Sequence, residues 1–441
     1  MRHKWITRIA MMVLYALVSS SFFALRAYPI LILPAIPVVL AINLLPGWGV
    51  KGVDRLRLKI CLHGDECLTV FLGSAAISIL YHLYLAMYML PDSWLEWGLS
   101  ALVAFCLEMM LFWNGIACVY LTSVQLGIRL RVVGLLCGLI PVAQLVALGK
   151  IMAVTFREVR EEAAKDALNE AREDQRLCAT KYPILLVHGV CFRDFKHLSY
   201  WGRIPRELER NGATVYFGEH QSARPVQASA EELAQRIRQL TADGKAEKVN
   251  IIAHSKGGLD CRWAMRDPDI AARVASLTTV NTPHRGCEYA DYLLNKISPK
   301  VQKQVAEAYN NAARLAGDTS PDFLAAMRDL TASACQQRNP QMPQPEGVYC
   351  QSVGSVLKRA AHGKFPLQYT YHVVKEFDGP NDGLVGIQSF AWGDAYELLE
   401  PTCRRGISHG DVIDLNRENI PGFDVREYYV QLVSRLRENG Y

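Results

Sequence analysis

Residues 249–259 read Val-Asn-Ile-Ile-Ala-His-Ser-Lys-Gly-Gly-Leu, an apolar run that leads into a serine, two glycines and a helix-like continuation. This order predicts a nucleophile elbow, the sharp turn between a strand and a helix that exposes a serine hydroxyl. In such a turn the residues two before and two after the serine crowd each other. Around Ser255 they are Ala253 and Gly257, which are both small. A serine between small residues also fits an ordinary turn, so the surrounding sequence has to decide between the two interpretations.

The sequence around this segment alternates between short apolar runs and helical stretches. The apolar runs lie at 184–187, 214–217, 249–253, 276–280 and 369–374, and a helix is expected at 228–240. Buried strands that alternate with helices predict an α/β fold, with a mostly parallel sheet and helices on both faces. Ligands of such sheets bind at the carboxyl ends of the strands.

Chain order selects the partners that Ser255 would need. In an α/β hydrolase the acid and the histidine follow the serine. Asp382 lies in the turn-like segment 379–385, and His409 is the one histidine that follows it. Ser255 would be the nucleophile, His409 the base, and Asp382 the acid that orients the imidazole. Asp378 is the alternative acid, and the alternative for His409 is a plain surface-loop histidine.

Two backbone N–H groups are expected to stabilise the negative oxygen formed during attack on a carbonyl. One is that of Lys256, the residue after the serine. The second should follow the first strand, where His188 and Gly189 end the apolar run 184–187, so Val190 is the expected donor. His188 itself is expected to pack in the turn rather than act as a second base.

Five segments carry a resemblance to a known family: YPILLVHG (182–189), AHSKGGLD (253–260), VNTPHRG (280–286), NDGLV (381–385) and SHGDVID (408–414). They resemble the bacterial triacylglycerol lipases of the α/β-hydrolase fold, both the pseudomonad type and related enzymes of Gram-positive bacteria, over about residues 181–441. The resemblance implies a lipid-ester hydrolase with Ser255, Asp382 and His409 as triad and with Val190 and Lys256 as oxyanion donors. A phospholipase or thioesterase on this scaffold and a weakly catalytic lipid-binding scaffold are the alternatives.

The resemblance also implies a calcium ion near the catalytic histidine. One ligand of that ion would be an aspartate two residues after the histidine, and Asp411 matches it. The stretch that should hold the second aspartate, 355–364, contains no acid. Calcium needs several oxygen ligands, so the sequence leaves Asp411 open as a calcium ligand or as a plain loop-capping acid. No other cofactor is expected.

A long insertion lies at 287–345, between strand elements. Segments 289–297, 301–315 and 322–334 have helical patterns, the first two amphipathic. Lipases use such helices as a lid over the active site. Ordinary helical cover on the sheet is the alternative.

Residues 1–155 are predicted to be a transmembrane region of about five helices. Five segments are apolar and close to the ~20 residues that span a bilayer. The proline-rich second segment should be kinked or short, and a cleaved signal peptide is the alternative for the first. Glu108 interrupts the fourth, where a hydrogen-bonded packing role is favoured over a functional one. The segments are 6–25, 28–46, 68–90, 99–121 and 132–155.

Charges predict how this region is oriented. Basic residues cluster before the first span and in the loops before the third and the fifth, which places these parts in the cytoplasm. An odd number of spans then puts the hydrolase domain, 181–441, on the extracytoplasmic side of the bacterial cell membrane. The charged segment 156–180 is expected to be a solvated helical linker. Pseudomonad-type lipases are freely secreted, so the membrane region departs from that pattern.

The charge balance also excludes a class of partner. Residues 1–155 hold 11 Lys/Arg and 6 Asp/Glu, which accounts for the whole net charge of +5, while the remaining 37 basic and 37 acidic residues cancel. A nucleic-acid-binding face would need a basic domain. The expected partners are therefore the membrane and a lipid ester, and no feature of the sequence identifies a protein partner. The cysteines show no zinc-ligand spacing.

Overall fold

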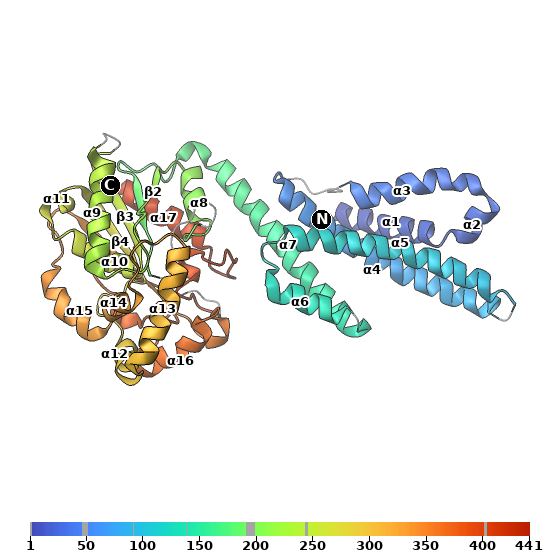
Figure 1. The fold of residues 1–441 in the computed structure, drawn as a ribbon. Helices are drawn as coiled ribbons and strands as arrows, with labels where there is room; N and C mark the ends of the chain where they lie inside the picture. Colours follow the sequence, from blue (N-terminus) through green and yellow to red (C-terminus); the bar gives the residue numbers. More distant parts are fainter. Residues whose placement is uncertain are drawn as a thin grey trace. The chain divides into compact units, whose positions relative to one another are not determined.

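A computed structural model of the chain describes residues 2–45, 52–90, 92–138, 140–190, 199–242, 246–400 and 404–441. The chain forms two compact units, Met1–Glu170 and Ala171–Tyr441. Figure 1 shows a helical first unit and a second unit in which helices surround a sheet. The boundary falls inside segment 156–180, which the sequence predicts to be a linker.

The second unit is built on a six-stranded parallel sheet in the order β2-β1-β3-β4-β5-β6. The predicted α/β fold class is confirmed. Strands β1 and β4 flank β3, the strand that leads into Ser255, so the serine emerges near the middle of the sheet. The strands are β1 (Ile184–Val187), β2 (Val215–Phe217), β3 (Val249–His254), β4 (Val274–Val280), β5 (Tyr349–Ser355) and β6 (Ala395–Leu399).

One predicted strand is wrong. Residues 369–374 belong to the helix α16 (Leu367–Asp378), and the sheet is completed instead by β5 and β6. Tyrosine, threonine and valine favour strands in isolation. In the folded chain the buried residues of this segment recur three or four apart, as helix packing requires. They are Leu367, Tyr371, Val374 and Asp378.

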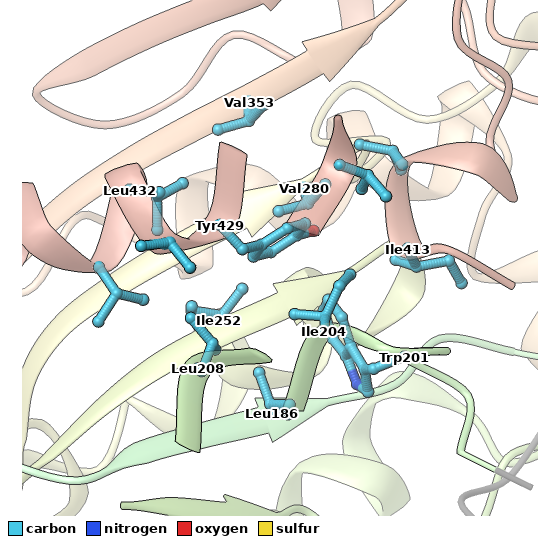
Figure 2. Packing of buried hydrophobic residues seen from close by; sticks show 14 of the residues in the cluster. Leu186, Trp201, Ile204, Leu208, Ile252, Val280, Val353, Ile413, Tyr429 and Leu432 are labelled. Carbon is cyan, nitrogen blue, oxygen red and sulfur yellow. The ribbon is translucent and has the colours of Figure 1, made fainter. Parts of the chain in front are cut away.

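Alternate strand residues point to opposite faces of the sheet, and helices cover both faces. On one face Leu185 and Val187 of β1 pack in a core with α9 (Val226–Ala242), α10 (Lys256–Ala264) and α11 (Pro268–Ala272). On the other face α8 (Ile204–Arg210) and α17 (Val425–Glu438) cover the strands. Figure 2 shows this second core, in which Tyr429 and Leu432 of α17 lie over Ile252, Val280 and Val353 of the central strands.

The insertion between β4 and β5 is helical, as its sequence pattern predicts. The single helix expected at 322–334 is replaced by two short helices. Thr331 separates them and caps the second by accepting a hydrogen bond from the N–H of Ala334. The helices are α12 (Glu288–Lys296), α13 (Pro299–Leu315), α14 (Phe323–Arg328) and α15 (Ala332–Arg338). The short 3-10 helices of this unit are η2 (Glu173–Gln175), η3 (Asn339–Gln341), η4 (Ala360–His362), η5 (Ile387–Ser389) and η6 (Asp411–Ile413).

The first unit is all helical. Among the described residues, α4 and α5 are the two helices that are long and apolar enough to cross a membrane. The apolar parts of the first two predicted spans, Trp5–Ser19 and Pro29–Leu44, are shorter. The elements are α1 (Arg2–Ser19), α2 (Phe22–Ala27), η1 (Pro29–Leu31), α3 (Ile32–Leu44), α4 (Leu56–Met89), α5 (Trp94–Thr122), α6 (Gly127–Cys137) and α7 (Pro141–Ala171).

The predicted fifth span, 132–155, is not one helix. Helix α6 ends at Cys137 and α7 begins at Pro141. Proline lacks a backbone N–H and restricts the residue before it, so it fits the first turn of a helix and not the interior. Helix α6 lies against α7 at Gly134, where a Cβ would be 2.8 Å from the side chain of Ile151. The two therefore form a helical hairpin.

Polar contacts explain the burial of two carboxylates in this unit. Glu108 accepts hydrogen bonds from Ser19 (3.0 Å) and Ser74 (2.7 Å), which fits the favoured packing role. The charged part of α7 is packed rather than solvated at its start, since Glu158 is 1% exposed and pairs with Arg57 at 2.5 Å. The expectation that segment 156–180 is solvated is therefore wrong at its start, around Glu158.

Tyr429 provides a test of the second core. Its ring is fully buried, 6.0 Å from that of Trp201, and its hydroxyl has no hydrogen-bond partner among the described residues. We expect Tyr429→Phe to leave the free energy of unfolding unchanged or to raise it by up to about 1 kcal/mol, because a buried unpaired hydroxyl is costly. Tyr429→Ala should lower it by about 3–5 kcal/mol through the cavity it leaves. Denaturant unfolding of the full chain measures both, and a large loss in Tyr429→Phe would contradict this expectation.

Candidate active site

Ser255 occupies the strained turn that the sequence predicts. Its backbone angles are φ 55° and ψ −131°, a conformation that residues with a side chain rarely adopt. The N–H of Ser255 donates to the carbonyl of Val280 on β4 at 2.9 Å, and α10 begins at the next residue, Lys256. The turn therefore lies at the carboxyl end of β3.

Close backbone approaches explain why small residues surround the serine. A Cβ at Gly257 would lie 2.4 Å from the carbonyl oxygen of His188, and one at Gly189 would lie 2.8 Å from the Cβ of Ser255. Neither glycine can be replaced without moving backbone or the serine itself. The end of β1 is thus held directly against the serine turn.

The structure brings Ser255, His409 and Asp382 together. The Nε2 of His409 lies 3.0 Å from the Oγ of Ser255, which is 154 residues away in the chain. The Nδ1 of His409 lies 2.6 Å from an oxygen of Asp382. The backbone N–H of His409 also donates to the carbonyl of Asp382, at 2.9 Å, so the two loops are joined at backbone and side chain.

Asp382 is fully buried and its carboxylate is held in one orientation. One oxygen accepts the backbone N–H groups of Leu384 and Val385, each at 2.8 Å. The other accepts the side-chain amide of Asn281 at 2.6 Å and faces His409. Sequence reasoning did not single out Asn281, although an amide directly after a central strand is a signal that could have found it.

Asp378, the alternative acid, has a different set of partners. Its carboxylate accepts the backbone N–H groups of Glu288 (3.0 Å) and Tyr289 (3.2 Å) at the start of α12. Burial raises the pKa of this carboxyl above its usual value. The described contacts therefore place Asp378 at a helix N-terminus, while Asp382 faces the histidine.

The two expected oxyanion donors belong to segments that adjoin Ser255. Lys256 is the first residue of α10, and Val190 follows Gly189, which lies against Ser255. The N–H of Gly189 donates to the hydroxyl of Tyr200 at 3.1 Å, and that hydroxyl lies 2.6 Å from the Nδ1 of His254. Sequence reasoning missed Tyr200, which fixes this loop.

The rings beside the site differ in what they can do. Burial, with a smaller contribution from nearby His409, lowers the pKa of His254 well below its usual value. The neutral imidazole of His254 can accept a hydrogen bond from the Tyr200 hydroxyl at Nδ1. His188 stacks on His220 at 4.0 Å and its nitrogens face two backbone carbonyls, so it packs in the turn as expected.

The side chain of Lys256 is held by other side chains of the protein. Its ammonium pairs with the buried carboxylate of Asp260 at 2.8 and 2.9 Å and with the hydroxyl of Ser229 at 2.9 Å. Burial raises the pKa of Asp260 to about 7, against the opposing effect of Lys256. The backbone N–H of Lys256 is therefore the group that it can offer to an oxyanion.

Asp411 lies two residues beyond His409, but its surroundings do not suit calcium. One carboxylate oxygen is 3.0 Å from the guanidinium of Arg405, and the other accepts the N–H of Ser408 at 3.0 Å. Burial raises the pKa of Asp411, and Arg405 opposes that shift. Within the described ranges no group of three His, Cys, Asp or Glu side chains could hold a metal ion.

A parallel sheet of this order, with a serine on a strained turn and an acid and a histidine on later loops, defines the α/β-hydrolase class. The comparisons with known proteins agree. The chain is 35% identical to a triacylglycerol lipase of Pseudarthrobacter phenanthrenivorans over 178 residues, which cover 37% of this chain and 55% of that protein. It is 29% identical to a triacylglycerol lipase of Vibrio cholerae over 243 residues, 53% of this chain and 76% of that protein. The resemblance to bacterial triacylglycerol lipases is confirmed.

Other comparisons set the limits of this likeness. A Burkholderia plantarii triacylglycerol lipase is 35% identical over 178 residues, covering 37% of this chain and 49% of that protein. The chain thus spans about half the length of this relative and of the Pseudarthrobacter one. No family model matches the chain. A Staphylococcus hyicus lipase structure has a TM-score of 0.47 at 16% identity, covering 59% of this chain and 97% of that one, a likeness too weak to add to the argument.

Proposed function

We propose that this chain is a membrane-anchored serine ester hydrolase that acts on lipid esters. One observation carries the proposal. The hydroxyl of Ser255, the two nitrogens of His409 and the carboxylate of Asp382 form a continuous hydrogen-bonded series, with spacings of 3.0 and 2.6 Å. This is the arrangement that activates a serine hydroxyl as a nucleophile.

The reaction follows from these positions. The Oγ of Ser255 attacks the ester carbonyl carbon while the Nε2 of His409 takes the hydroxyl proton, and Asp382 stabilises the imidazolium. The N–H groups of Val190 and Lys256 donate to the negative oxygen. His409 then protonates the departing alcohol, which leaves an acyl ester on Ser255. Water, deprotonated by His409, cleaves that ester, releases the fatty acid and restores the serine.

Exposed apolar side chains support a lipid substrate. Ser255 and His409 are only 6% and 7% exposed, so a substrate needs the covering segments to move. Apolar residues on α13 and near α16 face solvent, and an apolar surface of this kind is satisfied by lipid. They are Val301, Val305, Leu315, Phe365 and Tyr369. We infer that the insertion 287–345 acts as a lid whose open state a lipid surface favours.

The helices α4 and α5 support the membrane anchor, and charges in the first unit support its orientation. Arg57 binds the carbonyl of Thr122 at the end of α5 and the carboxylate of Glu158 on α7. The ring of Phe156, close to Glu158 on α7, lies 6.0 Å from the guanidinium of Arg8 on α1. The basic ends of α1 and α4, the end of α5 and the charged part of α7 thus share one end of the bundle.

This geometry favours a different orientation from the one expected from the sequence. That expectation counted 132–155 as a fifth span and put the hydrolase domain outside. We infer that the α6–α7 hairpin enters the membrane and returns to the end where Arg8, Arg55 and Arg57 gather, because Glu158 and Glu162 pair there with Arg57 and Arg55. The positive-inside rule makes that end cytoplasmic. We therefore infer that the chain continues from α7 into a hydrolase domain on the cytoplasmic side.

The proposed triad predicts a contrast between two aspartates. Ser255→Ala should lower ester hydrolysis by about 10³-fold or more, and Asp382→Asn should also be severe, because each removes part of the activation of the nucleophile. Asp378→Asn should be mild, since Asp378 binds the start of α12. Initial rates on a panel of lipid esters and labelling by a fluorophosphonate probe measure both. Full activity in Asp382→Asn alongside loss in Asp378→Asn would refute the assignment of the acid.

Lipid recognition predicts a rise in rate at an interface. Initial rates of the membrane-bound full chain, followed across the solubility limit of a long-chain glyceride, should rise above that limit more than rates on a soluble short-chain ester. Val301→Ser combined with Val305→Ser should reduce the rise several-fold, because it removes apolar surface from α13. Lys300→Ser, on the same helix, is the control. Smooth saturation with a preference for short chains would indicate a plain esterase.

The orientation predicts the behaviour of reporter fusions. A reporter that is active only in the cytoplasm should be active when fused after Tyr441, and one active only outside should be silent there. Fusions within the loop between α4 and α5, at the opposite end of the bundle, should give the reverse pattern. An external signal after Tyr441 would show that the α6–α7 hairpin crosses the membrane after all.

A further inference from the structure

The loop that carries His409 contains a charge cluster that the proposed reaction does not use. Arg405 precedes the histidine, and its Nη2 lies 3.0 Å from Asp411 and 3.3 Å from Glu418. Lys364 binds the other oxygen of Glu418 at 2.5 Å. The side chains of Asp411 and Arg405 are 2% and 17% exposed, so their attraction is only weakly screened by water.

Asp411 and Ser408 are hydrogen-bonded to each other across His409. The carboxylate of Asp411 accepts the N–H of Ser408 at 3.0 Å, while the hydroxyl of Ser408 accepts the N–H of Asp411 at 3.2 Å. These reciprocal bonds enclose the histidine between them. A shift of the Asp411 carboxylate would therefore move the backbone that sets the position of the imidazole.

The backbone around Arg405 is hydrogen-bonded to the segment that follows β5. The carbonyl of Arg405 accepts the N–H of Lys358 at 3.1 Å, and the N–H of Ile407 donates to Val356 at 2.8 Å. Both partners lie in the segment that directly follows β5. Arg405 thus connects the His409 loop to the segment at the carboxyl end of β5 through its backbone, and to Asp411 through its guanidinium.

In this cluster basic side chains occupy the surroundings of Asp411, where a calcium site would have further oxygen ligands. The resemblance to lipases implies a calcium ion bound by Asp411 and by a second aspartate from 355–364. That stretch supplies Lys358, Arg359 and Lys364 and no acid. The negative charges of Asp411 and Glu418 are already balanced by Arg405 and Lys364. A divalent cation would need several oxygen ligands and would be repelled by both basic side chains.

We propose that the guanidinium of Arg405 takes the place that the resemblance gives to calcium. It is a positioning residue, because it acts on His409 through Asp411 and touches no reacting atom. Arginine suits the role because its charge is permanent and its planar donors match carboxylates. The inference depends on the proposed function for its kinetic consequence. It makes hydrolysis independent of divalent metal.

The first test removes metal from the wild-type full chain. Ester hydrolysis and the midpoint of thermal unfolding are measured after incubation with EDTA and after addition of calcium chloride. Both should stay the same, with rates within about twofold. Loss of activity and a lower midpoint in EDTA, restored by calcium, would overturn the proposal. The unfolding midpoint decides this point even if the chain hydrolyses no ester, so failure of the proposed function is recognised separately.

The second test removes the guanidinium. Arg405→Ala should lower kcat about tenfold or more with KM little changed, because a misplaced base affects the chemical step and not binding. It should also lower the unfolding midpoint. Arg405→Lys should recover part of both effects. The matched control is Arg404→Ala, which removes an exposed neighbouring arginine.

Each outcome of the second test has a clear meaning. Equal behaviour of Arg405→Ala and Arg404→Ala would overturn the proposal. So would a fall in Arg405→Ala that appears in KM alone. If Arg405→Ala does not fold, Arg405→Lys supplies the kinetic comparison, and a wild-type kcat in that variant together with loss of wild-type activity in EDTA would refute the role of Arg405.

Discussion

A serine held at φ 55° is the constraint on which the second unit depends. The turn is possible because three neighbours leave room for it: Gly189, Ala253 and Gly257. The parallel register of β1, β3 and β4 then brings the end of β1 and the loop after β4 to the same edge of the sheet. Both helical layers stabilise those strands. The strain at one residue is therefore supported by the two cores that enclose the sheet.

The parts that sequence could predict are those set by local pattern and chain order. The strand–serine–helix pattern located the elbow, and the order of Asp382 and His409 selected two of its partners from the remaining acids and histidines. The strand expected at 369–374 failed because tyrosine and valine favour strands, whereas packing of Tyr371 and Val374 in α16 decided the outcome. Residues such as Asn281 and Tyr200 act through partners far away in the chain, which no local pattern reveals.

In the first unit, too, local sequence pattern does not reveal contacts between distant segments. Hydropathy identified apolar segments, and α4 and α5 agree with two of them. Hydropathy does not distinguish a helix that crosses a bilayer from a hairpin that enters and returns. The proposal made above rests on pairs such as Arg57 with Glu158, which join helices far apart in sequence. Whether segment 132–155 is counted as one span or as a hairpin changes the parity of the spans, and with it the side on which the hydrolase domain is inferred to lie.

The ion pair between Arg405 and Asp411 has a consequence for where such a protein can operate. Calcium sensors of the cytoplasm bind their ion with Kd values of about 10⁻⁷–10⁻⁵ M, which takes several well-placed oxygen ligands. A loop with one buried aspartate has too few oxygen ligands to bind calcium at such low concentrations. A cation that is encoded in the chain is always present at full occupancy, whatever the ionic composition of the compartment. On the proposal made above, the position of His409 is therefore set in the same way on either side of a membrane.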